Sequence, residues 1–184
     1  MAENVLKQLE EAESYKQRGN QFYKEGDYKR ALGNYWKVFL YVKGLSVPGD
    51  TSEAAQYAGM MGCSNSMKVP EDRLEDLRKL KQSTHLNMAA CFVKQGNWQR
   101  CIEACNGAQE GGELSKIFFR RGQAHMELRH LDEAQRDLQR AREMEPDDQA
   151  ISAALRSLRS LFAQQSAKEK RQFAGMFDRM AEAK

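Results

Sequence analysis

Large and small apolar residues recur with one spacing at three places along the chain. Each place has a small residue in its first half, two more small residues in its second half, and bulky side chains between them. Antiparallel helices approach closely only where side chains are small, and bulky residues fill the gaps between successive helix pairs. The pattern therefore predicts three repeats, each a helix–turn–helix unit. The small residues that fix their alignment are Gly19, Ala89 and Gly122.

Short polar segments separate the two helices expected in each repeat. They read EGDY, QGNW and LRHLD, and they carry Gly, Asn or Asp, which cap or break helices. The expected repeats cover about 12–45, 82–114 and 115–148. A chain that is helical throughout, with three stacked helix pairs, is the fold that these signals favour.

An extra segment separates the first two repeats. The starts of the second and third repeats lie 33 residues apart, whereas the first two starts lie 70 residues apart. The insert, about 46–81, contains VPGD and GMMGCSNS, which are typical of loops. From Pro70 onward, EDRLEDLRKLKQ predicts a helix that continues into the second repeat. The insert is either a tolerated loop without function or a contact for a partner, and both interpretations stay open.

A long helix is expected over about 149–180. Ile151, Leu155, Leu158 and Phe162 form one apolar stripe, which predicts that this helix covers the exposed edge of the last repeat. Beyond Gln165 the sequence becomes basic, and we expect that part to project beyond the repeats. Phe173, Met176, Phe177 and Met180 lie on one face near its end. We expect residues 1–184 to form a single domain.

Composition excludes several classes of protein. The chain has 184 residues and a formal net charge of +3, too small a charge to indicate nucleic-acid binding. It has no apolar stretch of membrane-spanning length, and its acidic N-terminus is unlike a signal peptide. We therefore expect a cytoplasmic protein without membrane insertion. Its four cysteines are Cys63, Cys91, Cys101 and Cys105, and the absence of a CxxC pair favours buried, reduced thiols.

The sequence offers no catalytic motif. It has no glycine-rich phosphate loop, no GxSxG and no HExxH. His85 and His125 occupy packing positions and His130 lies in a turn, so we interpret none of them as a general base. Cys101 and Cys105 could supply half a metal site, but no second pair accompanies them. We expect no enzymatic activity, no cofactor and no metal.

Polar residues on the first helix of each repeat are the strongest functional signal. Lys16 and Asn20 lie four residues apart, as do Lys116 and Arg120, and Asn87 lies on the middle repeat. First helices line the concave face of stacked helix pairs, so we expect these five residues to converge on one groove. Cations and amides donate hydrogen bonds to carboxylates. Any one of them alone would be an ordinary surface residue, but the joint pattern favours a carboxylate ligand.

The chain resembles the tetratricopeptide repeat domains of co-chaperones. Three stretches are similar to the C-terminal part of the large FK506-binding immunophilins: THLNMAACFVKQGNWQRCIEACNGA, FFRRGQAHMELRHLDEAQRDLQRA and KEKRQFAGMFDRMAE. The KGL after the first helix pair and the long insert resemble the tetratricopeptide repeat protein 9 family. The resemblance implies three tetratricopeptide helix pairs in a right-handed superhelix, followed by a C-terminal capping helix.

The resemblance also implies a ligand. In chaperone-binding members, five residues of the same types form a dicarboxylate clamp for the C-terminal EEVD-type tail of heat-shock protein 90 or 70. The matching residues here are Lys16, Asn20, Asn87, Lys116 and Arg120. Further peptide contacts are expected at Ala90, Lys94 and Gln123. The similar stretches include no isomerase domain, so the resemblance implies no prolyl isomerase activity.

An alternative function is a scaffold that uses a different surface. The insert or the C-terminal helix would then contact the partner. The stretch KEKRQFAGMFDRM is basic and amphipathic, as calmodulin targets are, so calmodulin is the alternative partner. No strip of alternating aromatic and basic residues points to nucleic acid.

Overall fold

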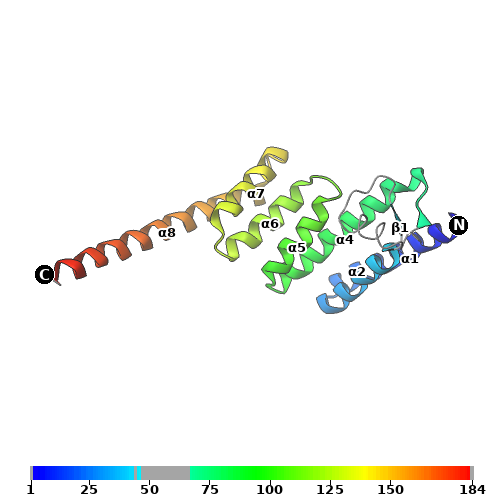
Figure 1. Ribbon diagram of the computed structural model, residues 1–184, viewed down its shortest axis with the longest axis horizontal. Helices are drawn as coiled ribbons and strands as arrows, with labels where there is room; N and C mark the ends of the chain where they lie inside the picture. The colour runs from blue at the N-terminus through cyan, green and yellow to red at the C-terminus, as the bar shows by residue number, and fades with distance from the viewer. Residues whose placement is uncertain (1, 44, 47–66, 183–184) are drawn as a thin grey trace, which may run out of the picture. The chain divides into compact units, whose positions relative to one another are not determined.

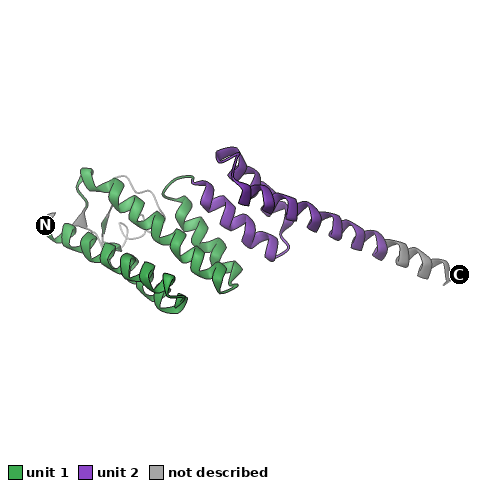
Figure 2. Cartoon of the chain, turned by 180° about the vertical axis from the view of Figure 1, so that it is seen from behind, with its two compact units in different colours: residues 1–113 green, residues 114–184 purple. Residues whose placement is uncertain are grey.

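Helices account for nearly all of the computed structural model, which describes residues 2–43, 45–46 and 67–182. The chain divides into two compact units, Met1–Glu113 and Leu114–Lys184 (Figure 2). Two strands of two residues each are the only strands in the described part. The all-α prediction is confirmed.

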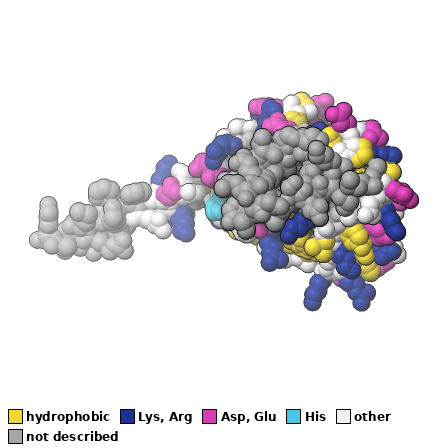
Figure 3. Space-filling model, turned by 45° about the vertical axis from the view of Figure 1, so that its right-hand side comes forward, with side chains coloured by type: hydrophobic (Ala, Val, Ile, Leu, Met, Phe, Trp, Pro, Cys, Tyr) yellow, Lys and Arg dark blue, Asp and Glu magenta, His cyan; other side chains and the backbone are white. Residues whose placement is uncertain are grey.

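Side chains of both charges, with apolar ones among them, lie on the face seen in Figure 3.

Unit 1 contains two helix pairs (Figure 1). The first pair is α1 (Ala2–Lys24) with α2 (Tyr28–Val42), and the second is α4 (Leu74–Lys94) with α5 (Trp98–Gln109). Helix α2 packs against α4, which joins the pairs. Helix α4 follows a 3-10 turn at Glu71–Arg73 and continues without a break into the second repeat, as predicted.

Helices α1 and α4 each begin several residues before the predicted start of their repeat. The extra turns at their N-terminal ends pack into one apolar core. Val5 of α1 and Leu77 and Leu80 of α4 are buried in the same apolar cluster as Val38 and Val42 of α2. The early turns of α1 are therefore held by tertiary packing, because an isolated helix end has little stability in water.

A short strand pair joins the start of the insert to a point within it. Strand β1 (Leu45–Ser46) pairs in parallel with β2 (Met67–Lys68), with Leu45 opposite Met67 and Ser46 opposite Lys68. Leu45 and Val69 are buried in the core of unit 1. The expected loop in the insert and Cys63 lie outside the described residues.

Unit 2 contains α6 (Ser115–Glu127), α7 (Leu131–Met144) and α8 (Gln149–Glu182). The apolar stripe of α8 packs as predicted, with Ile151, Leu155 and Leu158 buried and Phe162 half-buried. Residues 163–172 are all exposed, so α8 leaves the core after Phe162. The side chains of Phe173, Met176, Phe177 and Met180 lie outside those that are described. Among the described residues, no helix combines the length and apolarity that crossing a membrane requires.

The predicted small residues lie where paired helices touch. A Cβ atom on Gly122 of α6 would lie 2.9 Å from Cγ of Leu138 on α7, and Ala89 is completely buried. Cys91, Cys101 and Cys105 are also buried, as expected for thiols that serve as small packing residues.

The turn inside each helix pair has one backbone conformation in all three repeats. Gly26, Gly96 and Arg129 have positive φ angles of 81°, 68° and 62°. In the first two turns the next residue, Asp27 or Asn97, caps the second helix by accepting a backbone N–H bond. The third turn places a side chain where the left-handed conformation brings Cβ close to the backbone, which costs about 1–2 kcal/mol.

Replacing Arg129 by Gly should therefore stabilise the protein. We expect Arg129→Gly to raise the free energy of unfolding by about 0.5–1 kcal/mol, because the relief of strain exceeds the greater entropy of glycine in the unfolded chain. Urea unfolding measures the change. Arg129→Ala is the matched control, since it removes the charge but keeps Cβ, and it should stay within about 0.5 kcal/mol of the parent. An equal gain in both variants would mean that the arginine side chain, and not the backbone, is unfavourable here.

Candidate peptide-binding site

Of the five residues predicted to bind a carboxylate, Lys16, Asn20 and Asn87 lie on unit 1, and Lys116 and Arg120 lie on unit 2. On unit 1, Asn20 is the centre of the group. Its Oδ1 accepts a hydrogen bond from Nδ2 of Asn87 at 2.8 Å and another from the hydroxyl of Tyr35, also at 2.8 Å. These bonds join α1, α2 and α4. Because both bonds end on the oxygen of Asn20, its Nδ2 is directed elsewhere and can donate to a ligand.

Tyr35 fixes the position of Asn20. Only 1% of its surface is exposed, and its ring lies against Gly19, where a Cβ atom would be 2.5 Å from Cε1 of the ring. Burial raises the pKa of the Tyr35 hydroxyl well above its usual value, so the group stays protonated and donates. The repeat pattern accounts for Tyr35 only as one of its bulky packing residues. The hydroxyl group was the available signal for its contact with Asn20, because a phenylalanine would fill the same space without it.

Lys16 is held between α1 and α4. Its Nζ lies 3.0 Å from Oε1 of Glu13 and 3.4 Å from Oγ of Ser83, and the Lys16 side chain is 18% exposed. Ser83 in turn donates to the backbone oxygen of Leu80. Sequence reasoning missed Glu13 at this site. The spacing of three residues to Lys16 was the available signal, because such residues are neighbours on a helix.

On unit 2, Lys116 and Arg120 of α6 line one hollow of about 230 Å³. Lys116 is exposed and Arg120 is half-buried. The hollow also has two carboxylates in its wall, those of Glu145 and Asp148. Asp148 accepts the backbone N–H bonds of Ala150 and Ile151 and so caps α8, whereas Glu145 is exposed. Two cations and two carboxylates therefore share this hollow.

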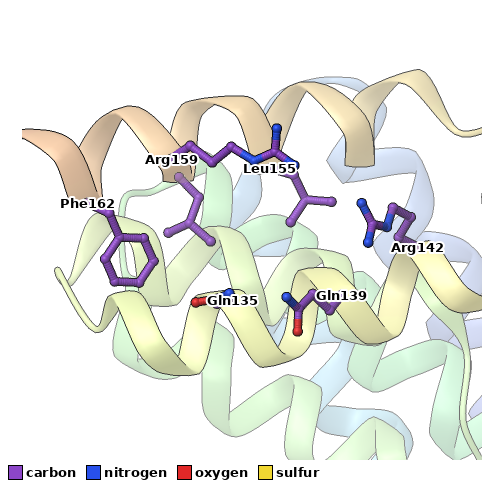
Figure 4. Close-up of a pocket in the computed structure, with 7 residues that line it drawn as sticks. Gln135, Gln139, Arg142, Leu155, Arg159 and Phe162 are labelled. Carbon is purple, nitrogen blue, oxygen red and sulfur yellow. The ribbon is translucent and has the colours of Figure 1, made fainter.

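A second hollow of unit 2, of about 120 Å³, lies between α7 and α8 (Figure 4). Leu155, Leu158 and Phe162 of α8 supply its apolar wall, and Arg142 and Arg159 approach it from the two helices. In contrast to the first hollow, its lining contains no carboxylate. Gln135 and Gln139 of α7 complete the lining.

The expected secondary peptide contacts fall on both units. Ala90 is half-buried and Lys94 is exposed in the last turn of α4. Gln123 is half-buried on α6. Their part in binding remains a prediction.

The histidines make packing contacts. The ring of His85 lies 4.3 Å from that of Phe39, and a Cβ atom on Gly107 would lie 2.7 Å from Cε1 of His85. Burial lowers the pKa of His85 to about 4, with a smaller contribution from Lys81, so the imidazole is neutral at pH 7. These contacts agree with the interpretation of His85 as a packing residue.

His125 lies beside an ion pair that ties α6 to α7. Arg121 donates from Nε and Nη2 to the two carboxylate oxygens of Asp137, each at 2.8 Å, and Asp137 is 8% exposed. The Nε2 atom of His125 lies 3.9 Å from Asp137. Across the described residues, no three or more His, Cys, Asp or Glu side chains are grouped so as to hold a metal ion.

The low pKa of His85 gives stability a pH dependence. The unfolded histidine binds a proton near pH 6.5 and the folded one only near pH 4, so the free energy of unfolding falls as the pH drops through this window. Because the ring is only partly buried, we expect a loss of about 1–3 kcal/mol. His85→Phe should remove this component, which urea unfolding at pH 7 and pH 4.5 measures. His130→Gln, at an exposed turn, is the control. Burial also lowers the pKa of His125, so part of the slope should remain, and a slope in His85→Phe as large as that of the parent would contradict the assignment.

The family comparison matches the third helix pair. Residues 115–148 match the family model described as Tetratricopeptide repeat, and this segment contains α6 and α7. The peptidyl-prolyl cis-trans isomerase FKBP4 of Rattus norvegicus is 30% identical over 180 residues, which are 97% of this chain and 35% of that protein. Its counterpart in Homo sapiens is 31% identical over 180 residues, with the same coverage. The chain thus spans about one third of the length of these relatives.

Solved structures share the fold. The C-terminal TPR-containing domain of an FK506-binding protein from Plasmodium falciparum has a TM-score of 0.69 and 18% identity, covering 91% of this chain and 95% of that one. The first TPR of Spaghetti (RPAP3), bound to the HSP90 peptide SRMEEVD, has a TM-score of 0.60 and 21% identity, covering 84% and 97%. The second TPR domain of human RPAP3, in complex with the HSP70 peptide SGPTIEEVD, has a TM-score of 0.58 and 23% identity, covering 81% and 95%.

Proposed function

We propose that this chain is a co-chaperone-like adaptor. It has the tetratricopeptide repeat fold, and nearly its whole length is similar to about one third of the FKBP4 isomerases. Its ligand is the acidic C-terminal tail of a heat-shock protein 90 or 70 chaperone. The observation that carries the proposal is the hydrogen bond between Asn20 and Asn87, because it unites two residues 67 positions apart that the carboxylate-binding pattern had selected.

The chemistry of the two groups suits such a tail. Lys16, Asn20 and Asn87 supply one ammonium and two amides, and Lys116 and Arg120 supply an ammonium and a guanidinium. A C-terminal aspartate carries two carboxylates, and a carboxylate accepts hydrogen bonds from donors of each of these types. Two relatives of the fold were solved with peptides that end in EEVD, which supports this ligand class. The isomerase activity in the names of the FKBP4 relatives belongs to those proteins, of which this chain spans 35%.

Magnitudes set the expected affinity. A hydrogen bond to a charged group contributes about 1.5–3 kcal/mol net. Three or four such bonds, less the cost of ordering a flexible peptide, give a Kd in the micromolar range, or about −8 kcal/mol. Ala90, Lys94 and Gln123 would contact residues upstream of the terminal aspartate in this proposal.

The first test is calorimetry with a peptide that ends in MEEVD. We expect micromolar binding to the free acid and none to the same peptide with an amidated C-terminus, because amidation removes one carboxylate. Lys116→Ala should weaken binding at least tenfold, since it removes one charge-assisted contact. Arg136→Ala, which removes an exposed cation of α7, is the control and should bind as the parent does. If Lys116→Ala stays within twofold of the parent, the site assignment is wrong.

A second candidate function is a scaffold whose acidic partner binds the last helix. Residues 163–172 of α8 are all exposed, and residues 149–172 contain five Lys or Arg and one Glu. Arg142 and Arg159, at the hollow between α7 and α8, extend the basic surface toward the start of the helix (Figure 4). Calmodulin is the acidic partner that the sequence of this helix favours.

A gel shift with calmodulin tests this second candidate. If calmodulin binds α8, the shift should require calcium and should be lost when Lys168, Lys170 and Arg171 are all changed to Gln. The matched control changes Lys24, Lys29 and Arg30 of unit 1 to Gln, which removes as many positive charges from exposed positions elsewhere. Equal loss in both triple variants would show that only net charge matters. Absence of a calcium-dependent shift would exclude calmodulin.

A further inference from the structure

We propose that Glu13 competes with the ligand carboxylate for Lys16 and thereby limits the affinity of the peptide-binding site. This inference rests on the proposed function, because it concerns the same lysine. It adds a residue that the five-residue pattern does not contain, and it assigns to that residue a control over affinity and over the response to salt.

The geometry around Lys16 carries the argument. An ammonium group has three hydrogen-bond donors. In the structure, one is directed to Glu13 at 3.0 Å and another to Ser83 at 3.4 Å. A ligand carboxylate must therefore use the remaining donor or displace Glu13. The Lys16 side chain is 18% exposed and that of Glu13 is 42% exposed, so Glu13 is the more accessible partner and has room to move away.

Electrostatics gives the sign of the effect. A ligand oxygen at hydrogen-bond distance from Nζ of Lys16 lies at most about 6 Å from the carboxylate of Glu13. Two negative charges at that separation repel each other, by an amount that depends on how far solvent screens them. For effective dielectric constants from about 80 down to about 30, the repulsion corresponds to a loss of about 3- to 20-fold in affinity. Removing the charge of Glu13 should restore that factor.

Glu13 could instead act by holding Lys16 in place, in which case its loss would weaken binding. The structure argues against this role. Ser83, on the neighbouring helix α4, holds the same ammonium group, and the lysine stem is already largely covered. An exposed ion pair between residues three apart on one helix holds its side chains in place only weakly. Lys16 therefore keeps its position when Glu13 loses its charge.

Unit 2 shows the same arrangement of charge. Glu145 and Asp148 line the same hollow as Lys116 and Arg120, so cations of each unit have carboxylates of the chain near them. Nearby carboxylates weaken the attraction of a cation for an acidic peptide over long distances. The association should depend less on salt than three exposed cations alone would require.

Calorimetry with the MEEVD peptide, on the parent and on Glu13→Gln, tests the inference. Glutamine keeps the size of the side chain and removes its charge. We expect binding to tighten about 3- to 20-fold and to become more sensitive to salt between 50 and 300 mM. Glu10→Gln is the matched control: it makes the same change in net charge on the exposed surface of α1, one turn earlier. It should stay within twofold of the parent.

The outcomes separate this inference from the proposed function. Tighter binding in Glu13→Gln that vanishes with the amidated peptide supports the competition, and so does binding that becomes measurable only in this variant. If the parent binds and Glu13→Gln binds equally or more weakly, the competition is wrong while the proposed function stands. An equal gain in Glu10→Gln would reduce the effect to net charge and overturn the role of Glu13. If no variant binds the free acid, the proposed function fails and takes the inference with it.

Discussion

The contact between Gly19 and Tyr35 is the constraint on which the rest of the site depends. Glycine lets the phenol ring lie directly against α1, and this close approach brings the Tyr35 hydroxyl to the side-chain oxygen of Asn20. With the oxygen of Asn20 directed at Tyr35 and Asn87, its amide nitrogen is directed away from both. The close packing of α1 and α2 therefore also fixes the orientation of the Asn20 side chain. The oxygen of Asn20 thus links the packing of α1, α2 and α4 to the orientation of an amide in the proposed site.

Much of the architecture could be predicted from the sequence, because close helix packing restricts residue size strongly. Gly19, Ala89 and Gly122 lie where side chains had to be small, and the stripe from Ile151 to Phe162 packs as its spacing predicts. The grouping of Asn20 with Asn87 also followed from their places in two repeats. These predictions succeeded because each depends on periodicity, which a single sequence displays directly.

The rest depends on contacts that periodicity does not encode. The partners of Lys16 are one residue a turn away and one on another helix, and nothing in the repeat pattern selects Glu13 and Ser83 from the other polar residues nearby. The second role of Tyr35 also needs the three-dimensional position of its hydroxyl. Arg129 is a further case. It has the same positive φ angle as Gly26 and Gly96, but the third turn has no glycine that would predict this conformation. Local sequence patterns identified Lys16, Lys116 and Arg120, whereas only the tertiary structure shows which carboxylates lie near them.

The parallel pairing of β1 with β2 has a consequence for how this chain can vary. Leu45 lies opposite Met67, so two points of the chain that are 22 positions apart are neighbours in unit 1. The entropy of closing the intervening segment grows only with the logarithm of its length. Segments of very different length and composition can therefore be exchanged between these two points at little cost to the helix pairs. The strand pair makes this position a natural point of insertion, where the chain can gain new sequence while α1, α2 and α4 keep their contacts.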